Sequence, residues 1–563
     1  MLEIFISCVL STIILLVYGN LFCSYFFKLN IYKTSNFSEN SIFGIIFLSF
    51  FALIINFLIP IEKSIGTIMI IISLVLFIIF SLRTKYKKEL VSYIFYTSVI
   101  TFFLLCLSNV NRPDAGLYHL PYTSLINENK IILGSTNIHF RFGHISSVQY
   151  LSSIYNNYLF SSSIITVPLA SIVSIFLVYL TKEFYSFFNK KKEIAFIIFL
   201  ILLFSIFNFN RYSSFGNDVP SHVYFFIIII YFLKINSLKK CDLNTFFKIF
   251  ILTIFLITLK LFMIVVIIIP FIMFLLSKYK KKIILNKNLI IFSIFGLLWV
   301  LKNLLTSGCL FYPIQKTCFK NLDYFNQKQT EQVVNASEAW SKGWSDQKEI
   351  ILSYDEYNKN LNWLKTWSNE HLKKIFEKIT PFAFFLIFLI LSIYFKKFFK
   401  SKNYKFNSIN KKRLLELFVI NLLFFSVWFF KFPLYRYGLS FIGLTLIIII
   451  FLLVSRNITL LNKKFFSTFI IIGFLALFLK NGIRIYEKLN IEYDNYPWPR
   501  IYSMSESDNN IEKKFTKITD DKNNFIFYYS QGQECMYSKS PCSNYKNKNL
   551  KIKKIYNYLI YYF

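Results

Sequence analysis

Long apolar segments alternate with short polar connections along most of the chain. Charge-free runs of 16 to 20 residues recur, for example over 4–23 and 43–60, and this length matches the hydrocarbon core of a bilayer. The pattern predicts an all-α polytopic membrane protein with about fourteen transmembrane helices. The expected spans are 4–22, 42–60, 65–82, 90–108, 163–181, 193–209, 221–236, 247–261, 262–277, 288–305, 379–395, 414–431, 437–454 and 465–481.

Two of these spans have alternative interpretations. The first lacks a basic stretch before it and a small-residue cleavage site after it, so we expect a helix of the mature protein and not a signal peptide. The adjacent spans between Lys248 and Ser277 could instead form one long helix bent around Lys260.

Three polar regions are too long to be simple turns, and they divide the chain into six parts. The tail contains an apolar run, "FIFYYS", followed by two cysteines, which predicts a small mixed α/β domain outside the membrane. The expected parts are N-terminal helices 1–107, a first outer loop 108–162, a transmembrane core 163–305, a second outer loop 306–378, C-terminal helices 379–481 and a tail domain 482–563.

The second outer loop is rich in tryptophan. Trp340 and Trp344 are followed by Trp363 and Trp367 in the run "YNKNLNWLKTWSNEHLKKIFEKI". Tryptophans at such positions commonly form an interfacial belt. The helical spacing of the apolar residues is also compatible with an amphipathic helix on the membrane surface.

The formal net charge is +34, yet nine of the 63 basic residues are arginine and the rest are lysine. This balance is typical of an AT-rich genome, and we expect no nucleic-acid partner. The position of the charge is more informative, because six basic clusters fall in short connections. They are Arg83 with Lys85, Lys87 and Lys88; 190–192; Lys234 with Lys239 and Lys240; 278–282; 411–413; and Lys463 with Lys464.

The positive-inside rule places these connections in the cytoplasm. With fourteen spans, all six clusters then share one side, and both termini and the three long regions face outward. The predicted location is the cytoplasmic membrane of a bacterium, with any active site facing the periplasm or the exterior.

Cysteine spacing is consistent with this orientation. Cys309 and Cys318 share one outer region, and Cys535 and Cys542 share another. Each pair could close a small loop in an oxidising compartment, with free thiols as the alternative. The chain has no CxxC pair that indicates zinc.

Candidate chemistry begins at "DAGLYHLPY", residues 114–122. In a short helix Tyr118 shares the face of Asp114, and Pro121 follows His119 closely. A carboxylate at a membrane boundary can accept a proton or bind a divalent metal. Alternatively, Asp114 caps the helix that follows "NRP".

Further polar groups are predicted at the same membrane face. "GNDVPSH" supplies Asp218 and His222, and Lys260 interrupts an otherwise uncharged stretch of 29 residues. Arg436 lies in the short outer loop "FPLYRYG", against the charge bias of the other short loops. Ionisable groups at such positions are functional candidates, and two acids with two bases suit a reaction that releases a phosphate.

These motifs carry a family resemblance. "DAGLYHLPYTSLINENKIILG" resembles the first outer loop of polytopic bacterial GT-C type glycosyltransferases, and "GNDVPSH" is similar to their second acidic loop. "WVLKNLLTSGCLFYP" and "PLYRYG" resemble two later segments, so an ordered series spans roughly the first 440 residues. The chain differs from the simplest family pattern in having four predicted spans before Asp114 in place of one. The "CMYSKSPC" tail resembles uncharacterised relatives with paired cysteines.

The resemblance implies transfer of a sugar from a polyprenyl-phosphate donor to a glycan, lipid or protein acceptor at the outer membrane face. Asp114 would be the catalytic acid position that activates the acceptor. Asp218 would be the second acid, with Asp114 and Asp218 as possible ligands of Mg²⁺ or Mn²⁺; the motifs require no other cofactor. The expected catalytic residues are Asp114, Asp218 and His119, and the expected substrate-binding residues are Tyr118, Arg141, His144, His222, Lys260, Asn303 and Arg436.

Two other functions remain open at this point. A polymerase or ligase of surface polysaccharide would also use outer-face charges and a lipid-linked donor. A transporter is a third interpretation, but it should have polar or broken helices near mid-membrane, whereas here the polar groups concentrate at one face.

Overall fold

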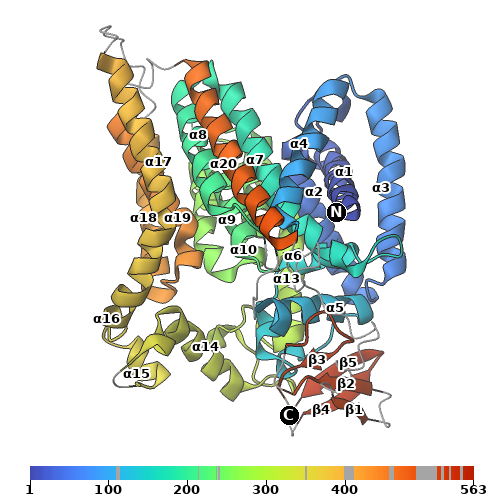
Figure 1. Ribbon diagram of the computed structural model, residues 1–563. Coiled ribbons are helices and arrows are strands. Elements are labelled where there is room, and N and C mark those ends of the chain that lie inside the picture. Colours follow the sequence, from blue (N-terminus) through green and yellow to red (C-terminus); the bar gives the residue numbers. More distant parts are fainter. Residues whose placement is uncertain are drawn as a thin grey trace.

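A computed structural model shows a mostly helical protein with a small strand region at the C-terminal end (Figure 1). It describes the chain except for residues 109–113, 213–214, 236–237, 239–240, 349–350, 399–410, 456–461, 490–515, 521–524, 532–533, 546–549 and 563. The predicted Lys239 and Lys240 of one basic cluster, the "NRP" before Asp114 and the first part of the tail therefore lie outside the described residues.

Within the described part of the chain, ten helices are long and apolar enough to cross a membrane. They confirm a multi-pass membrane protein, and their lengths follow from uninterrupted apolar sequence. They are α1 (Leu2–Phe27), α2 (Phe37–Leu58), α3 (Lys63–Arg83), α4 (Lys87–Leu105), α7 (Val167–Phe188, extended to Ile164 by a 3-10 turn), α13 (Lys287–Ser307), α17 (Lys373–Phe398, continuous with the preceding turns from Leu364), α18 (Lys411–Lys431), α19 (Tyr435–Val454) and α20 (Lys463–Leu489).

The other four expected spans are also helical but shorter. Three are α8 (Lys192–Asn208), α9 (Asp218–Lys234) and α10 (Leu243–Leu259), each of 17 residues. The fourth combines the 3-10 helix η7 (Leu261–Ile267) with α11 (Ile268–Leu276). The structure thus supports ten spans by length and does not confirm fourteen.

Lys260 separates the last two of these segments. It ends α10 in an extended conformation, with φ −153° and ψ 113°, and α11 contacts α10. The chain therefore turns back at this lysine, and the alternative of one long bent helix is wrong.

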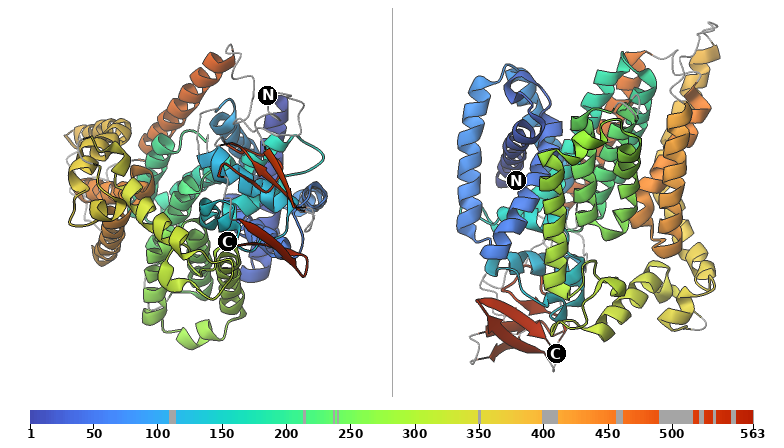
Figure 2. Two further views of the ribbon diagram at one scale, coloured as in Figure 1. Left: turned by 90° about the horizontal axis from the view of Figure 1, so that it is seen from below. Right: turned by 180° about the vertical axis from the view of Figure 1, so that it is seen from behind.

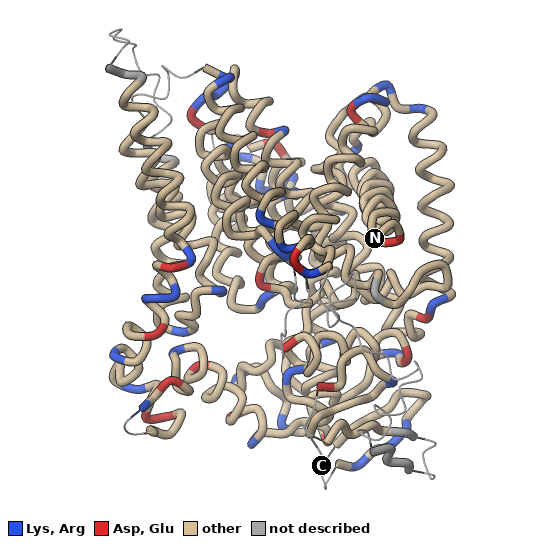
Figure 3. The backbone as a smooth tube through the Cα atoms, viewed as in Figure 1, with Lys and Arg blue, Asp and Glu red and all other residues tan. Residues whose placement is uncertain are grey.

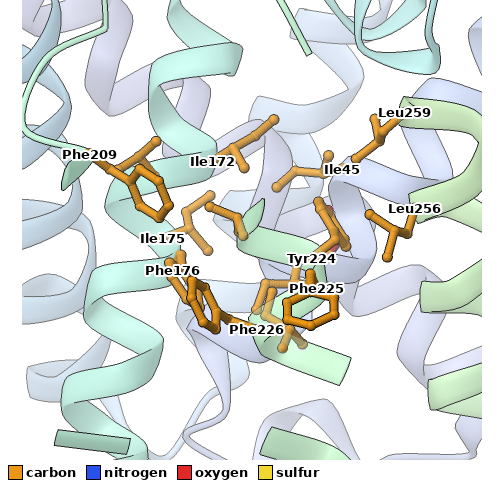
Figure 4. Close-up of a cluster of buried hydrophobic side chains, with 14 of the residues drawn as sticks. Ile45, Ile172, Ile175, Phe176, Phe209, Tyr224, Phe225, Phe226, Leu256 and Leu259 are labelled. Atoms are coloured by element: carbon orange, nitrogen blue, oxygen red, sulfur yellow. The ribbon is translucent and has the colours of Figure 1, made fainter. Parts of the chain in front are cut away.

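The interior of the helical layer is apolar and rich in aromatic side chains. Figure 4 shows part of it, where α2, α7, α9 and α10 meet around Tyr224, Phe225 and Phe226. These three side chains are completely buried. Helix α9 is apolar on all sides because neighbouring helices surround it, as expected for a central helix. At the edge of this cluster, Leu259 directly precedes Lys260, and the ring of Phe209 lies 6.3 Å from that of His222; both partners belong to the polar site described below.

The long polar regions gather at one end of the helices, which we call the large-loop end (Figures 1 and 2). The first contributes the π-helix η2 (Ala115–His119), α5 (Leu120–Glu128), the 3-10 turns η3 (Ser135–Asn137) and η4 (Phe140–His144), and α6 (Ser147–Ile154). The second contributes α14 (Gln327–Ser341), α15 (Tyr354–Asn358), α16 (Leu364–Trp367) and the π-helix η10 (Ser368–Leu372).

Two of the four tryptophans of the second region do not form a surface belt. Trp363 and Trp367 are buried and contact the ring of Phe429 on α18, with centroid distances of 5.5 and 5.2 Å. The helical run expected here is divided among α15, α16, η10 and α17 because it folds against α18 and does not lie flat. Trp340 remains half exposed.

The tail forms two small sheets. Strands β1 (Thr516–Asp520) and β2 (Phe525–Tyr529) pair antiparallel, and β2 pairs parallel with β3 (Cys542–Ser543). Strands β4 (Lys551–Ile555) and β5 (Tyr558–Tyr562) form the second, antiparallel pair. The run "FIFYYS" is thus a strand, as predicted, while helix α20 continues to Leu489, past the expected domain boundary at 482.

Both predicted cysteine pairs are bonded in the structure. Cys309 is bonded to Cys318, and Cys535 is bonded to Cys542. The remaining four cysteines are buried and take part in no disulfide. Each disulfide closes a short loop at the large-loop end.

Basic residues mark the opposite end of the helices, which we call the basic end. The α3–α4 and α7–α8 connections, which carry two of the predicted clusters, both lie there (Figure 3). The separation of long polar regions from basic connections is the asymmetry that the sequence predicted. This asymmetry distinguishes the two ends of the helix bundle. Which end faces the cytoplasm is a question for experiment.

Candidate active site

Five charged side chains from five elements of the fold join in one network at the large-loop end. Two acids alternate with three cations, in the order Arg141, Asp114, Arg436, Asp218 and Lys260. They come from η4, the start of η2, α19, α9 and the turn after α10. The four residues on which the sequence-based hypothesis rests, Asp114, Asp218, Lys260 and Arg436, therefore do meet in space.

Asp114 is held by two arginines. Its Oδ1 accepts a hydrogen bond from Arg141 Nη1 at 2.5 Å, and its Oδ2 lies 3.3 Å from Arg436 Nη1. The guanidinium of Arg141 also lies over the ring of Tyr118, 5.2 Å from its centroid. Although Asp114 occupies the N-cap position of η2, its side chain makes no capping hydrogen bond. The structure thus uses this carboxylate for ion pairing and not as a helix cap.

Asp218 begins α9 and pairs with Lys260 through its Oδ1. Its Oδ2 lies 3.6 Å from Arg436 Nε. The Lys260 ammonium also lies 3.3 Å from the centroid of the Tyr437 ring, an attractive cation–π arrangement. Lys260 reaches Asp218 because α10 ends one residue before it, which frees its side chain from the helix face.

Arg436 connects the two acids, and its backbone is fixed by the turn that precedes α19. Trp428 Nε1 donates a hydrogen bond to the Leu434 carbonyl at 2.9 Å. Gly438 packs directly on that indole, where a Cβ atom would come within 2.2 Å of it. His222 Nε2 donates to the Arg436 carbonyl at 2.8 Å, and Ser440 lies 2.9 Å from His222 Nδ1. His222, expected to bind substrate, contacts the backbone of Arg436 in this structure.

The network carries one surplus positive charge, because three cations face two carboxylates. It is also open: the Arg436 side chain is 53% exposed and that of Asp114 31%. An open, net-cationic cluster attracts an anion. The long contacts between Arg436 and the two acids leave its guanidinium able to bind a further oxyanion.

The histidines beside the network are neutral. Burial lowers the pKa of His119 to about 4 and that of His139 to about 3. Gln149 Nε2 lies 3.1 Å from His119 Nδ1, and Arg141 N donates to His139 Nδ1 at 3.1 Å, so both Nδ1 atoms accept. His119 is buried behind Tyr118, with ring centroids 4.2 Å apart, and forms no ion pair with Asp114 in the described structure.

Two other predicted residues lie apart from the ion pairs. His144 is exposed and its ring lies 5.3 Å from that of Tyr312. Asn303, near the end of α13, accepts a hydrogen bond from Lys302 at 3.0 Å and contacts the Leu310 carbonyl. These contacts are local to the C-terminal end of α13. None of them reaches the charge network.

A divalent metal does not fit the donor set. Among the described residues, no group of three or more His, Cys, Asp or Glu side chains converges. Each of the two carboxylates already contacts two cations, which would repel Mg²⁺ or Mn²⁺. Arg436 occupies the place between the acids that a shared metal would need.

Sequence reasoning missed several residues that contact the site. Tyr437 follows Arg436 directly in "PLYRYG", so the motif itself could have indicated it. Gln149 gave no local signal, because its contact with His119 Nδ1 at 3.1 Å joins residues 30 positions apart. Glu534 of the tail, which lies against Gly116, was missed for the same reason.

Residues 1–443 match the family described as Domain of unknown function (DUF8201). The match includes all five residues of the charge network and stops before the tail. No curated protein and no solved structure matches the chain.

Proposed function

The chain belongs to this family, and we propose that it is a membrane glycosyltransferase that moves a sugar from a polyprenyl-phosphate donor to an acceptor hydroxyl. The observation that carries the proposal is the open network of three cations and two acids around Arg436. A phosphate leaving group requires cations, and a hydroxyl nucleophile requires a base. Both kinds of group meet here at one end of a membrane helix bundle.

The donor phosphate would bind at Arg436 and Lys260. Arg436 has the more exposed side chain and the longer contacts, 3.3 and 3.6 Å, so it can turn towards a ligand at small cost. Lys260 lies deeper, beside Tyr437. Together they would stabilise the negative charge that develops as the sugar–phosphate bond breaks.

Asp114 would then act as the base. Binding of phosphate to Arg436 draws that guanidinium away from Asp114 Oδ2, while Arg141 keeps Oδ1 in place at 2.5 Å. The freed Oδ2 accepts the proton of the acceptor hydroxyl as its oxygen forms a bond to C1 of the sugar. The C1–O bond to phosphate breaks, and the polyprenyl phosphate leaves with the electron pair.

Two further considerations support the proposal. The motifs that resemble GT-C glycosyltransferases, around Asp114, Asp218 and Arg436, contribute three of the five residues of the network. Fourteen crossings, with α8, α9, α10 and η7–α11 counted as short spans, would place the large-loop end outside the cell, where lipid-linked sugars are used as donors.

The direct test is sugar transfer by purified protein in detergent or nanodiscs. A panel of radiolabelled polyprenyl-phosphate sugars is offered with membrane glycolipids, and labelled product and donor binding are measured together. Arg436→Met should weaken donor binding about tenfold or more. Lys431→Met is the matched control, since Lys431 is a cation on the same hairpin that pairs with Glu338 at 3.3 Å, away from the network. Equal loss in both variants, or no transfer from any donor by the wild type, would reject the proposal.

Orientation is tested separately. A periplasmic reporter fused after Phe563 should be active, and a cytoplasmic reporter at the same position should be silent. The opposite result would place the charge network on the cytoplasmic side, where a different donor class would have to be considered.

A further inference from the structure

The tail touches the first candidate motif through its disulfide-closed loop. Met536, inside the Cys535–Cys542 loop, donates its backbone N–H to the Gly116 carbonyl at 2.9 Å. The same loop binds α5 next to the motif at three further points: Ser124 Oγ donates to the Ser538 carbonyl, Tyr537 Oη lies 3.0 Å from Asn127 Oδ1, and Ser540 N donates to Glu128 Oε2 at 2.8 Å. A rigid loop from the far end of the chain is thus fixed against η2 and α5.

This contact requires a glycine in the motif. A Cβ atom at position 116 would lie 2.1 Å from Glu534 Oε2 and 2.3 Å from Met536 Sδ. The Glu534 carboxylate therefore rests on the surface of η2, two residues from Asp114. Gly116 is what allows a tail carboxylate to reach this point.

Glu534 differs from the acids of the charge network. It is only partly buried, and within the described residues no hydrogen bond or ion pair engages its carboxylate, whereas Asp114 and Asp218 each contact two cations. Burial and the nearby charge of Asp114 raise the pKa of Glu534. The side of Asp114 that faces the tail is consequently acidic, and the side that faces Arg436 is cationic.

We propose that Glu534 is a specificity-determining residue that accepts hydrogen bonds from hydroxyl groups of a carbohydrate acceptor. The inference rests on the proposed function and names the acceptor class for the same site. The phosphate of the donor belongs on the cationic side, since Glu534 would repel it. A glycan brings hydroxyl donors and no negative charge, and a carboxylate without a partner can accept two of them. The acceptor is thereby held with one hydroxyl towards Asp114.

The test compares Glu534→Gln with Asp323→Asn. Gln has nearly the same size and should preserve the fold. Asp323 provides the matched control, because it also contacts the tail, through Lys553 at 2.6 Å, but lies away from the motif. Binding of purified protein to an array of soluble oligosaccharides is measured first without donor, and the tightest binder is then used as acceptor in steady-state transfer.

Loss of a charge-assisted hydrogen bond should weaken glycan binding and raise the acceptor KM about tenfold in Glu534→Gln. Donor binding should be unchanged and kcat should stay within about twofold. Glu534→Asp, which keeps the charge, should recover part of the loss, and Asp323→Asn should resemble the wild type.

The outcomes separate this inference from the proposed function. Wild-type protein that binds a glycan through Glu534 but transfers no sugar would overturn the glycosyltransferase and leave the glycan site standing. Transfer with an acceptor KM that Glu534→Gln does not change overturns the role of Glu534. The same holds if the wild type binds no oligosaccharide on the array, if a lipid or peptide proves to be the acceptor, or if Glu534→Gln and Asp323→Asn lose binding equally.

Discussion

The protein has a second set of buried ion pairs at its basic end, and it contrasts with the network at the large-loop end. Lys248 pairs with Glu39 at 2.6 Å, and Lys234 pairs with Glu183 at 2.8 Å. These four side chains are 12–18% exposed, and two cations balance two acids. Tyr231 donates a further hydrogen bond to Glu39. In the large-loop network, three cations face two acids, and the Arg436 side chain is 53% exposed.

The difference indicates which network can bind a ligand. In these two pairs each cation has one acid, and the pairs lie between α2, α7, α9 and α10, so they join helices. At the large-loop end the surplus cation is also the most exposed member, and its contacts are the longest. Similar residue types thus join helices at the basic end and can bind a ligand at the large-loop end. The difference lies in the balance of charges and in their exposure to solvent.

The largest expected effect comes from the acid at the open end. Asp114→Asn keeps the shape and the hydrogen bond from Arg141 but removes the base, so turnover should fall roughly 10²- to 10⁴-fold while donor binding persists. The turnover rate is measured as single-turnover sugar transfer by purified protein. A wild-type rate would show that Asp114 has a structural role, since asparagine would then serve equally well.

The corresponding change at the closed end should act on folding. Glu39→Gln leaves the Lys248 ammonium without its charge partner in a buried position, and the cost of breaking such a pair is about 3–5 kcal/mol. Thermal unfolding in detergent should shift strongly, whereas the transfer rate per folded molecule should not. Reduced turnover of folded Glu39→Gln protein would contradict the division between the two ends.

A smaller effect is expected for the cation that lies deeper in the open network. Lys260→Met removes one of two proposed phosphate contacts, and donor binding should weaken roughly tenfold. Donor binding by the wild type should weaken as salt rises, because the Arg436 side chain is 53% exposed and its ionic contact with the donor phosphate would be screened. Donor titrations at low and high ionic strength measure this, and salt-independent binding in wild type and variant would argue against a charged ligand.

The smallest effect concerns pH and the histidines. His119 and His139 have pKa values of about 4 and 3 in the folded protein, below the usual 6.5. Between pH 6.5 and 4 the unfolded chain binds more protons, so stability falls as pH falls, by on the order of 1 kcal/mol per pH unit for each histidine. His139→Gln should reduce this slope in unfolding experiments at pH 7 and pH 5. Since the pairs of the basic end contain no histidine, acid should open the large-loop end first, as hydrogen exchange can show.

Much of the helical architecture could be predicted from the sequence. All fourteen expected apolar segments are helical, because a charge-free run of that length has few alternatives in a membrane. Helix ends were less predictable: α9 begins at Asp218 and α10 at Leu243, three and four residues before the expected starts, since tertiary contacts and not hydropathy decide where a buried helix begins. The burial of Trp363 against Phe429 was not predictable either, because it joins distant segments.

The site was predictable in part. Charged residues in apolar surroundings stand out in any sequence, which is why Asp114, Asp218, Lys260 and Arg436 could be singled out. Their pairing could not be read from spacing, because Arg436 lies 322 positions from Asp114. Burial of His119 and the backbone contact of His222 depend on the same distant elements, and so does the approach of Glu534 to Gly116.

The packing of Gly438 on Trp428 has an evolutionary consequence. Any side chain at position 438 would displace the indole, which holds the Leu434 carbonyl and hence the turn that carries Arg436. Within "FPLYRYG", a substitution of Gly438 is therefore coupled to the residue at position 428. Among related sequences, we expect a larger residue at 438 to occur only where Trp428 has been replaced by a smaller one, a covariation that a set of homologues can reveal.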